Sequence, residues 1–542
     1  MKFLKYTFLL ALYLALHSCK NSQVDLLVTN AKIYTVNQDF SVAEAMAIKD
    51  GKILEIGNSQ ALQKKYKAKE TLHAEGKYIY PGFIDAHTHF LRYGLTLQQA
   101  DLVGTQSWEE VVQRVEDFAQ NHTEGWLVGM GWNQNAWENK DFPDNQLLNE
   151  KFPDRPVMLG RIDGHALIAN QKALDMAGIT SDTKIEGGSV VLKNGKTTGV
   201  LIDNAMKILR SAVPEPDAEL ASKALLEAQK KCFAVGLTSV HDAGSEPRDV
   251  ELMDSLQKSG KLKMNIYALI RESSESVRWL FERGKIKTER LEVRGFKALS
   301  DGALGSRGAC LLMPYSDQPD WNGFLLNSPE HFDSLAKAVR QHDMQLATHA
   351  IGDSANRTIL KIYAKYLKGE NDLRWRIEHA QIVNENDFHY FKENQIVPSV
   401  QPTHATSDMY WAIDRVGKER LKNAYANKKL LNENSWISLG TDFPIEDISP
   451  LKTFYAAVFR QDASGFPQGG FQMENALSRE EALRGMTIWA AKSAFQEKEK
   501  GSLEAGKSAD FILLDKDIME APEKEILTTK VLKTYINGER VY

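Results

Sequence analysis

Short apolar runs recur along the middle of the chain and alternate with longer, amphipathic stretches. Runs of this length predict buried strands, and most of the stretches between them are long enough for a crossover helix. Such strands, alternating with helices, predict an α/β fold, a (β/α)8 TIM-type barrel with its reactive groups at the carboxyl ends of the strands. The eight predicted strands are Phe83–Ala86, Thr238–His241, Asn265–Leu269, Gly295–Leu299, Gln345–Thr348, Trp375–Glu378, Val397–Gln401 and Trp436–Gly440.

The two ends of the chain carry a different pattern, in which strand-like segments are joined by tight turns. Asp50-Gly51 and Asn537-Gly538 are both hairpin signals. Neither end has enough strands for a stable sheet of its own. We therefore predict that residues 19–80 and 501–542 pair into one small β-sandwich beside a barrel over residues 81–500.

The gap between the first and second predicted strands is far too long for a single helix. It contains further strand signals at 126–128 and 156–159, and a hairpin signal at Asn194-Gly195. Long loops at the catalytic face of a barrel commonly act as lids. We predict an inserted subdomain over about residues 105–215 at that face.

Composition and charge narrow the classes of partner. The chain has 542 residues, with 67 Lys and Arg against 72 Asp and Glu, so its formal net charge is −5. A nucleic-acid-binding protein would need a clustered basic face, which this balance does not suggest. A small-molecule substrate is the expected partner, and the sequence leaves the formation of a homo-oligomer open.

The first residues read as an export signal. Lys2 and Lys5 precede the apolar run Phe8–Leu16, which is too short to span a membrane. The ending before Cys19 resembles a bacterial lipobox, so residues 1–18 are predicted to be a lipoprotein signal peptide and Cys19 to be lipidated. A lipid anchor would tether the exported protein to a membrane. Plain secretion is the alternative.

Two observations bear on the compartment. Lys20 is not the acidic residue associated with inner-membrane retention, which favours the outer membrane or periplasmic face of a bacterial cell envelope. A Cys232–Cys310 disulfide could form in an oxidising compartment, but two cysteines so far apart give little support for it. Cys232 lies on an apolar helical stretch and is predicted to pack in the core.

His87 and His89 are the first candidate for chemistry. They are two residues apart at the end of the first predicted strand, so both imidazoles point to the same side of an extended backbone. Two neutral imidazoles suit a divalent transition metal such as zinc. The alternative is that one histidine is a hydrogen-bonded core residue and the other is exposed.

Other residues that could bind a metal lie within or at the ends of later predicted strands. Lys297 lies in the apolar fourth strand, where a charged amine is costly unless it is paired or chemically altered. A neutral amine there could take up carbon dioxide as a carbamate and bridge two metals, or the side chain could extend to water. His349 and His379 end strands five and six, and Asp442 follows strand eight. Each alone could be structural, but together with His87 and His89 they predict a metal centre.

In these residues and the segments around them, the chain resembles the amidohydrolase superfamily, specifically the branch of metal-dependent hydrolases that contains N-substituted formamide deformylases. The resemblance runs from about Val24 to the carboxyl terminus. The motifs are specific for the superfamily and branch, and weakly specific for the substrate. The segments that carry it are Pro81–His89, Lys297 with Ser300–Ala309, Thr348–Asp353, Arg376–Ala380, Gly440–Pro444 and Gly506–Leu513.

The resemblance implies a mechanism and a ligand set. One or two divalent ions, with zinc expected, would generate a metal-activated hydroxide that attacks the carbonyl of an N-acyl, N-formyl or cyclic amide. Asp442 would be the catalytic residue that takes the water proton and returns it to the leaving nitrogen. The implied ligands are His87, His89 and Asp442 on one side, His349 and His379 on the other, and the carbamate of Lys297 as the bridge.

Other polar residues are candidates for substrate binding. His165 lies in a segment of the insertion that resembles this branch, and we favour a substrate contact over a structural role. Asp301 and Arg307 could hold a polar substrate group or pair with each other. His404 and His241 lie near the rim, in either a substrate-binding or a supporting role.

Two other functions remain as alternatives. The same metals could hydrolyse an ester or catalyse a non-hydrolytic reaction. The protein could also be a non-catalytic lipoprotein that binds small molecules, although a binder need not keep a base beside two metal positions.

Overall fold

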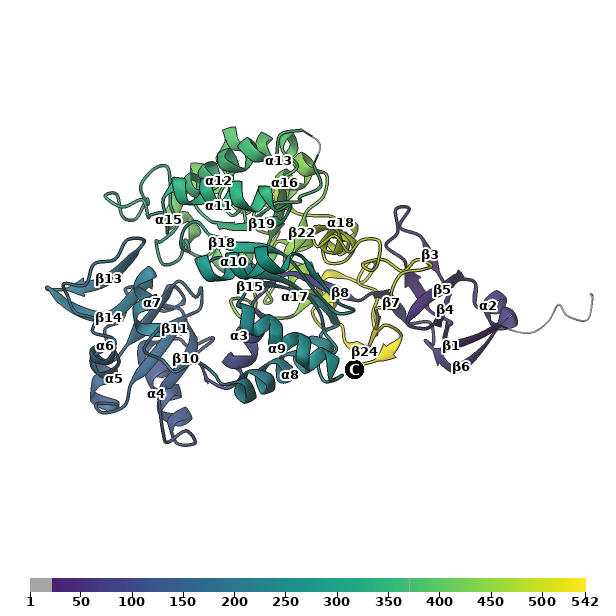
Figure 1. Ribbon diagram of the computed structural model, residues 1–542, viewed down its shortest axis with the longest axis horizontal. Coiled ribbons are helices and arrows are strands. Elements are labelled where there is room, and N and C mark those ends of the chain that lie inside the picture. Colours follow the sequence, from purple (N-terminus) through teal and green to yellow (C-terminus); the bar gives the residue numbers. More distant parts are fainter. Residues whose placement is uncertain (1–21, 370) are drawn as a thin grey trace, which may run out of the picture.

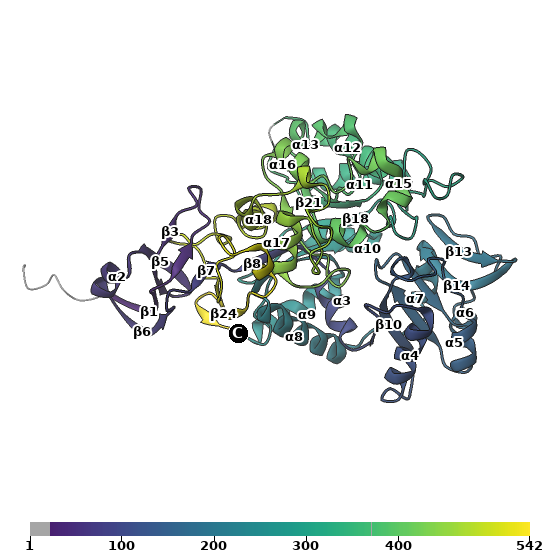
Figure 2. The ribbon, with the colours of Figure 1, turned by 180° about the vertical axis from the view of Figure 1, so that it is seen from behind.

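The computed structural model describes residues 22–369 and 371–542. The predicted signal peptide and the predicted lipidation of Cys19 lie outside these residues. Figure 1 shows a central barrel, with the amino-terminal sheets on one side and the insertion on the other, and the view from behind in Figure 2 agrees.

The central sheet confirms the predicted barrel. Its parallel strands follow the order β8-β15-β16-β18-β19-β20-β21-β22, and a bridge between Thr88 and Phe443 brings its two edges together. The second and fourth strands are longer than predicted and the eighth is shorter. The strands are β8 (Phe83–Thr88), β15 (Leu237–Ser245), β16 (Asn265–Arg271), β18 (Leu291–Leu299), β19 (Gln345–Ala350), β20 (Arg376–His379), β21 (Val397–Val400) and β22 (Ser438–Leu439), with β17 (Ile286–Lys287) beside β18.

Helices follow the barrel strands and bury one apolar face against them. In α8 (Ala218–Ala234), Asp217 caps the amino terminus by accepting from the backbone N–H of Leu220, and Leu225 and Cys232 are buried. Cys232 therefore packs in the core as predicted, and it and Cys310 are free thiols. The others are α3 (Phe90–Thr96), α9 (Pro247–Lys258), α10 (Ser274–Arg283), α11 (Pro329–Gln341), α12 (Asp353–Tyr366), α13 (His389–Glu393), α14 (Pro402–Asp408), α15 (Ala412–Leu421), α16 (Asn427–Asn434), α17 (Pro450–Phe459), α18 (Arg479–Gly485) and α19 (Ile488–Ser493), with 3-10 turns η2 (Glu385–Asp387) and η3 (Met473–Asn475).

The two chain ends form a β-sandwich, as predicted. One sheet has the order β5-β4-β1-β6, and the other, β25-β24-β23-β7-β2-β3, joins strands from both ends. Leu26, Ile79 and Phe511 share one core between the sheets. The elements are β1 (Ser22–Thr29), β2 (Lys32–Tyr34), β3 (Val42–Ala43), β4 (Ala45–Lys49), β5 (Lys52–Gly57), α2 (Ser59–Lys65), β6 (Tyr66–His73), β7 (Tyr78–Pro81), β23 (Phe511–Leu514), α20 (Glu523–Ile526), β24 (Val531–Ile536) and β25 (Glu539–Arg540).

Both predicted hairpins of the sandwich are present. Asp50 and Gly51 join β4 to β5 with φ of 49° and 74°, and Asn537 and Gly538 join β24 to β25 with φ of 50° and 72°. Positive φ at both central residues is the geometry that matches the twist of paired strands, and Asp-Gly and Asn-Gly adopt it readily.

The insertion is a separate mixed sheet with the order β13-β14-β12-β11-β10-β9. Trp132 and Trp137 pack in its core. Its elements are β9 (Ala100–Asp101), α4 (Trp108–Ala119), β10 (Leu127–Trp132), η1 (Gln134–Ala136), α5 (Gln146–Lys151), β11 (Val157–Arg161), β12 (Ala166–Ala169), α6 (Gln171–Met176), β13 (Gly188–Lys193), β14 (Lys196–Asp203) and α7 (Asn204–Arg210).

None of the helices in the described residues combines the length and the hydropathy needed to cross a membrane.

Candidate metal centre

Side chains from six places along the chain meet at the carboxyl end of the barrel strands. The reason is topological, because parallel strands in a barrel all end at the same face. Five of these residues are buried and the side chain of His89 is 25% exposed. They are His87 in β8, His89 directly after it, Lys297 in β18, His349 in β19, His379 in β20 and Asp442 after β22.

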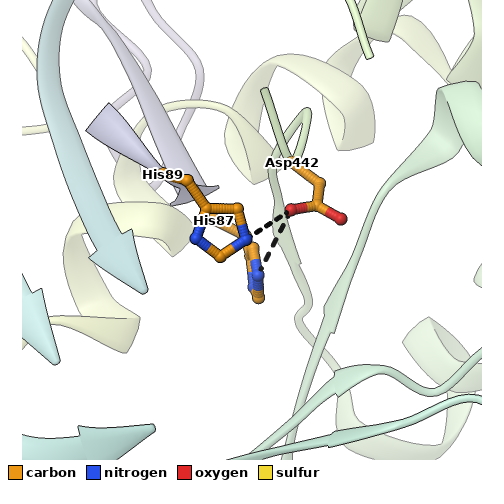
Figure 3. A group of neighbouring side chains, drawn as sticks. All are labelled: His87, His89 and Asp442. Atoms are coloured by element: carbon orange, nitrogen blue, oxygen red, sulfur yellow. Dashed lines mark ion pairs between the residues drawn. The ribbon is translucent and has the colours of Figure 1, made fainter. Parts of the chain in front are cut away.

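His87, His89 and Asp442 form one group (Figure 3). Asp442 Oδ1 lies 3.1 Å from His89 Nε2 and 3.6 Å from His87 Nε2. The backbone holds this spacing, because the N–H of Asp442 donates to the carbonyl of His87 at 2.8 Å. Gly440 permits the close approach, since a Cβ there would lie 2.6 Å from the backbone nitrogen of His87.

Lys297 points into the barrel rather than to water. Its residue is 3% exposed, and Nζ lies 3.0 Å from His87 Nε2. Burial lowers the pKa of Lys297 to about 8, although the charges of Glu378 and Asp442 oppose this shift. The alternative in which the amine extends to solvent therefore does not hold, and the amine is partly neutral near pH 8.

His349 and His379 lie on the other side of the group. The centroid of the His379 ring is 4.8 Å from that of His87 and 4.7 Å from that of His349. Nδ1 of His379 contacts Gln401 Oε1 at 2.7 Å, which leaves Nε2 for another partner. Burial holds the pKa of both imidazoles well below the usual value, so both are neutral and able to bind a metal.

Asp442 also belongs to a second group, with His379 and His404. His404 Nε2 lies 3.5 Å from Asp442 Oδ2, and His404 Nδ1 lies 3.0 Å from Glu446 Oε1. Burial lowers the pKa of His404, but the contacts with Asp442 and Glu446 outweigh it and raise the pKa to about 10. Burial by itself would raise the pKa of Asp442. The contacts with His404 and His89 and the charge of His87 outweigh burial and hold this pKa well below the usual value.

Residues that were not among the predicted site residues hold the candidate metal ligands in place. Oε2 of Glu378 contacts Nδ1 of His87, and Oε1 lies 2.6 Å from Nε of Arg376. Asp85 accepts from the backbone N–H of His87 at 3.1 Å and from the hydroxyl of Thr441 at 2.6 Å, which links the first and last strands. The sequence carried a signal for both acids, because each is a charged residue inside a predicted buried strand.

A cavity of about 620 Å³ opens above this centre, between the barrel and the insertion. His165 and His404 both line it. Nδ1 of His165 lies 2.6 Å from Asp203 Oδ1, and its ring centroid is 5.0 Å from that of His349. Burial lowers the pKa of His165, but the charge and hydrogen bond of Asp203 outweigh it, so the net shift is upward.

Asp301 and Arg307 are placed differently from the expectation. Asp301 is fully buried and accepts the backbone N–H groups of Cys310, Ile351 and Gly352 at 2.8 to 3.0 Å. Arg307 lies 3.0 Å from Asp317 and neither residue of the expected pair lines the cavity. Neither alternative for these residues is therefore seen: they do not line the cavity and do not pair with each other, because backbone donors already occupy the carboxylate of Asp301 and Arg307 contacts Asp317.

His241 is the last of the predicted rim residues. It is buried behind the site, with Nδ1 3.3 Å from Nη1 of Arg376, and it does not line the cavity. A supporting role fits this position and a direct substrate contact does not.

The residues at the centre fit a divalent metal. Asp442 Oδ1 and His349 Nε2 are buried and make no hydrogen bond within the described residues, although His89 Nε2 lies 3.1 Å from the first atom and Asp301 Oδ1 lies 3.5 Å from the second. Buried polar atoms normally have partners, so two such atoms beside neutral imidazoles are a reason to expect a cation. Imidazole nitrogens and carboxylate oxygens are a donor set that zinc accepts.

Comparison with known proteins identifies similar chains. A model of the amidohydrolase family matches residues 70–542. The chain is 34% identical to Protein LONG AFTER FAR-RED 3 of Arabidopsis thaliana, over 96% of this chain and 91% of that protein. It is 27% identical to the N-substituted formamide deformylase of Arthrobacter pascens, over 95% and 97% of the two chains.

A solved structure agrees with these relatives. The crystal structure of an uncharacterised metal-dependent hydrolase from Pyrococcus horikoshii matches with a TM-score of 0.76 and 28% sequence identity. The match covers 92% of this chain and 99% of the other. The similarity therefore includes the barrel, the insertion and the terminal strands together.

Proposed function

Because the chain belongs to the amidohydrolase family, we propose that it hydrolyses amide-like C–N bonds in small molecules. The substrates in this proposal are N-acyl or N-formyl compounds or cyclic amides. The observation that carries it is the meeting of buried Lys297, His379 and Asp442 in the wall of a cavity large enough for a small molecule. The similarity to a formamide deformylase supports the choice of bond.

We propose that the centre holds one or two zinc ions. His87, His89 and Asp442 would hold one, His349 and His379 the other, and Lys297 as its carbamate would join the two. A bound divalent metal supplies Lewis-acid polarisation of a carbonyl and lowers the pKa of water towards neutral.

The remaining steps fall to the chain's own residues. Asp442 accepts the proton of the attacking water and returns it to the leaving nitrogen, since its low pKa keeps it ionised to begin with. His404, 3.5 Å from Asp442 Oδ2, orients that carboxylate. The raised pKa of His165 favours an imidazolium, whose Nε2–H can stabilise negative charge on the carbonyl oxygen.

A substrate screen tests this function. Enzyme loaded with zinc or manganese is incubated with N-formyl, N-acetyl and cyclic amides, with matched esters in parallel. Release of the amine supports the proposal, and Asp442→Asn should abolish it while the thermal midpoint is retained. Turnover of esters alone, or tight binding of these compounds without turnover, would contradict amide hydrolysis.

We also propose that Cys19 carries a lipid anchor, after removal of residues 1–18, and that the anchored protein faces the periplasm or lies at the outer membrane. The charge and hydropathy of the first residues support this. Labelled palmitate should be incorporated into the wild-type protein and not into Cys19→Ser. Equal incorporation in both would contradict the anchor.

A further inference from the structure

Four of the lysine and arginine residues that line the cavity lie outside the metal centre and form no ion pair within the described residues. They come from three segments that are far apart in the sequence. Arg92 lies on α3, Lys207 and Arg210 lie on α7 of the insertion, and Arg271 ends β16. We refer to these four residues as the cation cluster.

The cation cluster has almost no partners of its own. Across residues 22–369 and 371–542, the side chains of Lys207, Arg210 and Arg271 make no hydrogen bond or ion pair. Arg92 makes only a 3.7 Å contact from Nη2 to the sulfur of Met130. Arg92 and Arg210 are half-buried, whereas Lys207 and Arg271 are exposed to solvent. Arginine at a half-buried position usually pairs with a carboxylate, so Arg92 and Arg210 call for an explanation.

The acidic residues around the cavity do not supply the missing partners, because they are paired elsewhere. Asp203 contacts His165, and Glu272 contacts His331 at 2.9 Å. The other paired acids at the cavity are Asp163 with Arg161, Glu215 with Arg248, Asp242 with Ser245 and the N–H of Phe90, Glu246 and Asp249 in a helix cap, Asp408 with Tyr425, and Glu446 with His404 and Ser407.

The cations also oppose one another. Burial, together with the charges of Arg92 and Arg271, lowers the pKa of Arg210 to about 9, although the charge of Asp203 opposes the shift. Arg210 remains a cation at neutral pH, so the repulsion persists in the free protein. An anion in the cavity would relieve it and would gain charge-assisted hydrogen bonds.

The cluster lies close to the proposed reaction centre. In the register of the parallel pair, Arg271 on β16 is opposite Lys297 on β18, and neighbouring strands are about 5 Å apart. The guanidinium of Arg92 packs on Gly164, where a Cβ would lie 2.9 Å from Nη2. Gly164 immediately precedes His165, so Arg92 is beside the residue proposed to contact the carbonyl oxygen.

We propose that the cation cluster binds a carboxylate of the substrate, so that the amide cleaved is that of an N-acyl or N-formyl amino acid or a related acid. This inference rests on the proposed hydrolysis for its reaction, but the binding site itself does not depend on turnover. The short separation of the cluster from the metal ligands suits a carboxylate a few bonds from the amide.

The test compares two probes that differ at a single group. N-acetylphenylalanine carries a carboxylate and N-acetylphenylalaninamide carries a neutral amide in its place, and both are used as D and L forms. Binding is measured by calorimetry on full-length protein, both chelator-treated and zinc-loaded. We expect the carboxylate of one enantiomer to bind about tenfold more tightly than the amide.

Variants then assign that preference to the cluster. Arg210→Gln and Arg271→Gln should each reduce the preference severalfold, with thermal midpoints near that of the wild type. Arg283→Gln removes the same charge from α10, where Arg283 pairs with Glu251 outside the cavity, and should leave the preference unchanged. Equal binding of the two probes to the wild type, or a preference retained in both cluster variants, would overturn the inference.

The outcomes also separate this inference from the proposed reaction. Preferential carboxylate binding without hydrolysis of any amide would support an anion site at the cation cluster and contradict the proposed activity. Equal hydrolysis of neutral and anionic amides, with no binding preference, would support the proposed hydrolase activity and contradict the anion site.

Discussion

Nδ1 of His87 and Oε2 of Glu378 are in hydrogen-bond contact inside the barrel, where neither side chain is exposed. The contact fixes the tautomer, because the nitrogen that faces the carboxylate carries the proton. The lone pair of Nε2 is thereby directed to Lys297 and Asp442. A residue of the sixth barrel strand thus orients a candidate metal ligand in the first strand.

We expect Glu378→Gln to weaken metal binding about 10- to 100-fold, because an amide neither fixes the tautomer of His87 nor raises its basicity as a carboxylate does. Affinity can be measured by competition with a fluorescent chelator. Glu292→Gln is the matched control, since Glu292 is a buried acid at the other end of the barrel, near Gln496. Equal affinity in the wild type and Glu378→Gln would contradict the orienting role.

Carboxylation of Lys297 should become faster as the pH rises. Only the neutral amine reacts with carbon dioxide, and with a pKa of about 8 its neutral fraction rises from about a tenth at pH 7 to about nine tenths at pH 9. At constant dissolved carbon dioxide, the initial rate of carbamate formation in metal-free protein should rise about tenfold over this range. Labelled carbon dioxide and 13C NMR would report the carbamate.

The control for that experiment is Lys297→Met, which fills the same space without an amine and should show no carbamate signal. Lys297→Ala should lose metal and activity together. Full activity in Lys297→Ala would show that the centre works without this residue.

We expect His165→Asn to lower kcat by about 10²-fold, with little change in KM, if Nε2–H of His165 stabilises the carbonyl oxygen mainly in the transition state. Steady-state kinetics on a substrate found in the screen would measure both constants. His122→Asn, at an exposed turn of the insertion, is the control and should match the wild type. A rise in KM at constant kcat would instead assign His165 to ground-state binding.

Asp517→Asn should destabilise the β-sandwich. Asp517 is reached by Lys32 Nζ at 2.7 Å, Tyr80 Oη at 2.8 Å and Tyr34 Oη at 2.9 Å. Replacing this acceptor should cost about 1–3 kcal/mol of unfolding free energy and lower the thermal midpoint. Glu520→Gln removes the exposed partner of the same lysine and should cost less than about 1 kcal/mol.

The effect of Asp517→Asn should depend on pH. Burial raises the pKa of Asp517, but the hydrogen bonds from Lys32, Tyr80 and Tyr34 lower it below the usual value overall. The stabilisation is therefore complete above the unfolded pKa of about 4 and is lost as the pH falls further. Thermal midpoints of the wild type and variant should differ at pH 7 and converge in acid; a constant difference would contradict this origin.

The barrel was predictable because most of its strands contain a short apolar run, and such a run marks a buried strand; β20, with three polar residues in four, is the exception. The candidate ligands were predictable because His87, His349, His379 and Asp442 lie at or just after the ends of predicted strands and Lys297 lies within one. Their meeting then follows from the parallel arrangement of the strands rather than from any local feature.

What the sequence does not indicate depends on contacts between distant segments. Arg307 turns to Asp317 because Asp301 is already held by backbone N–H groups, and no residue pattern shows how that loop folds. The cation cluster combines α3, α7 and the end of β16, which are brought together only by the position of the insertion.

Strand β7 leads through Gly82 into β8, the first strand of the barrel, and β7 pairs along its edge with β23 near the end of the chain. During translation, the edge of β7 has no partner until Phe511–Leu514 has left the ribosome. A polypeptide that stalls or is cut before that point would expose an open strand edge at the amino end of β8. Assembly of the β-sandwich thus waits until the segment that follows the barrel has been synthesised.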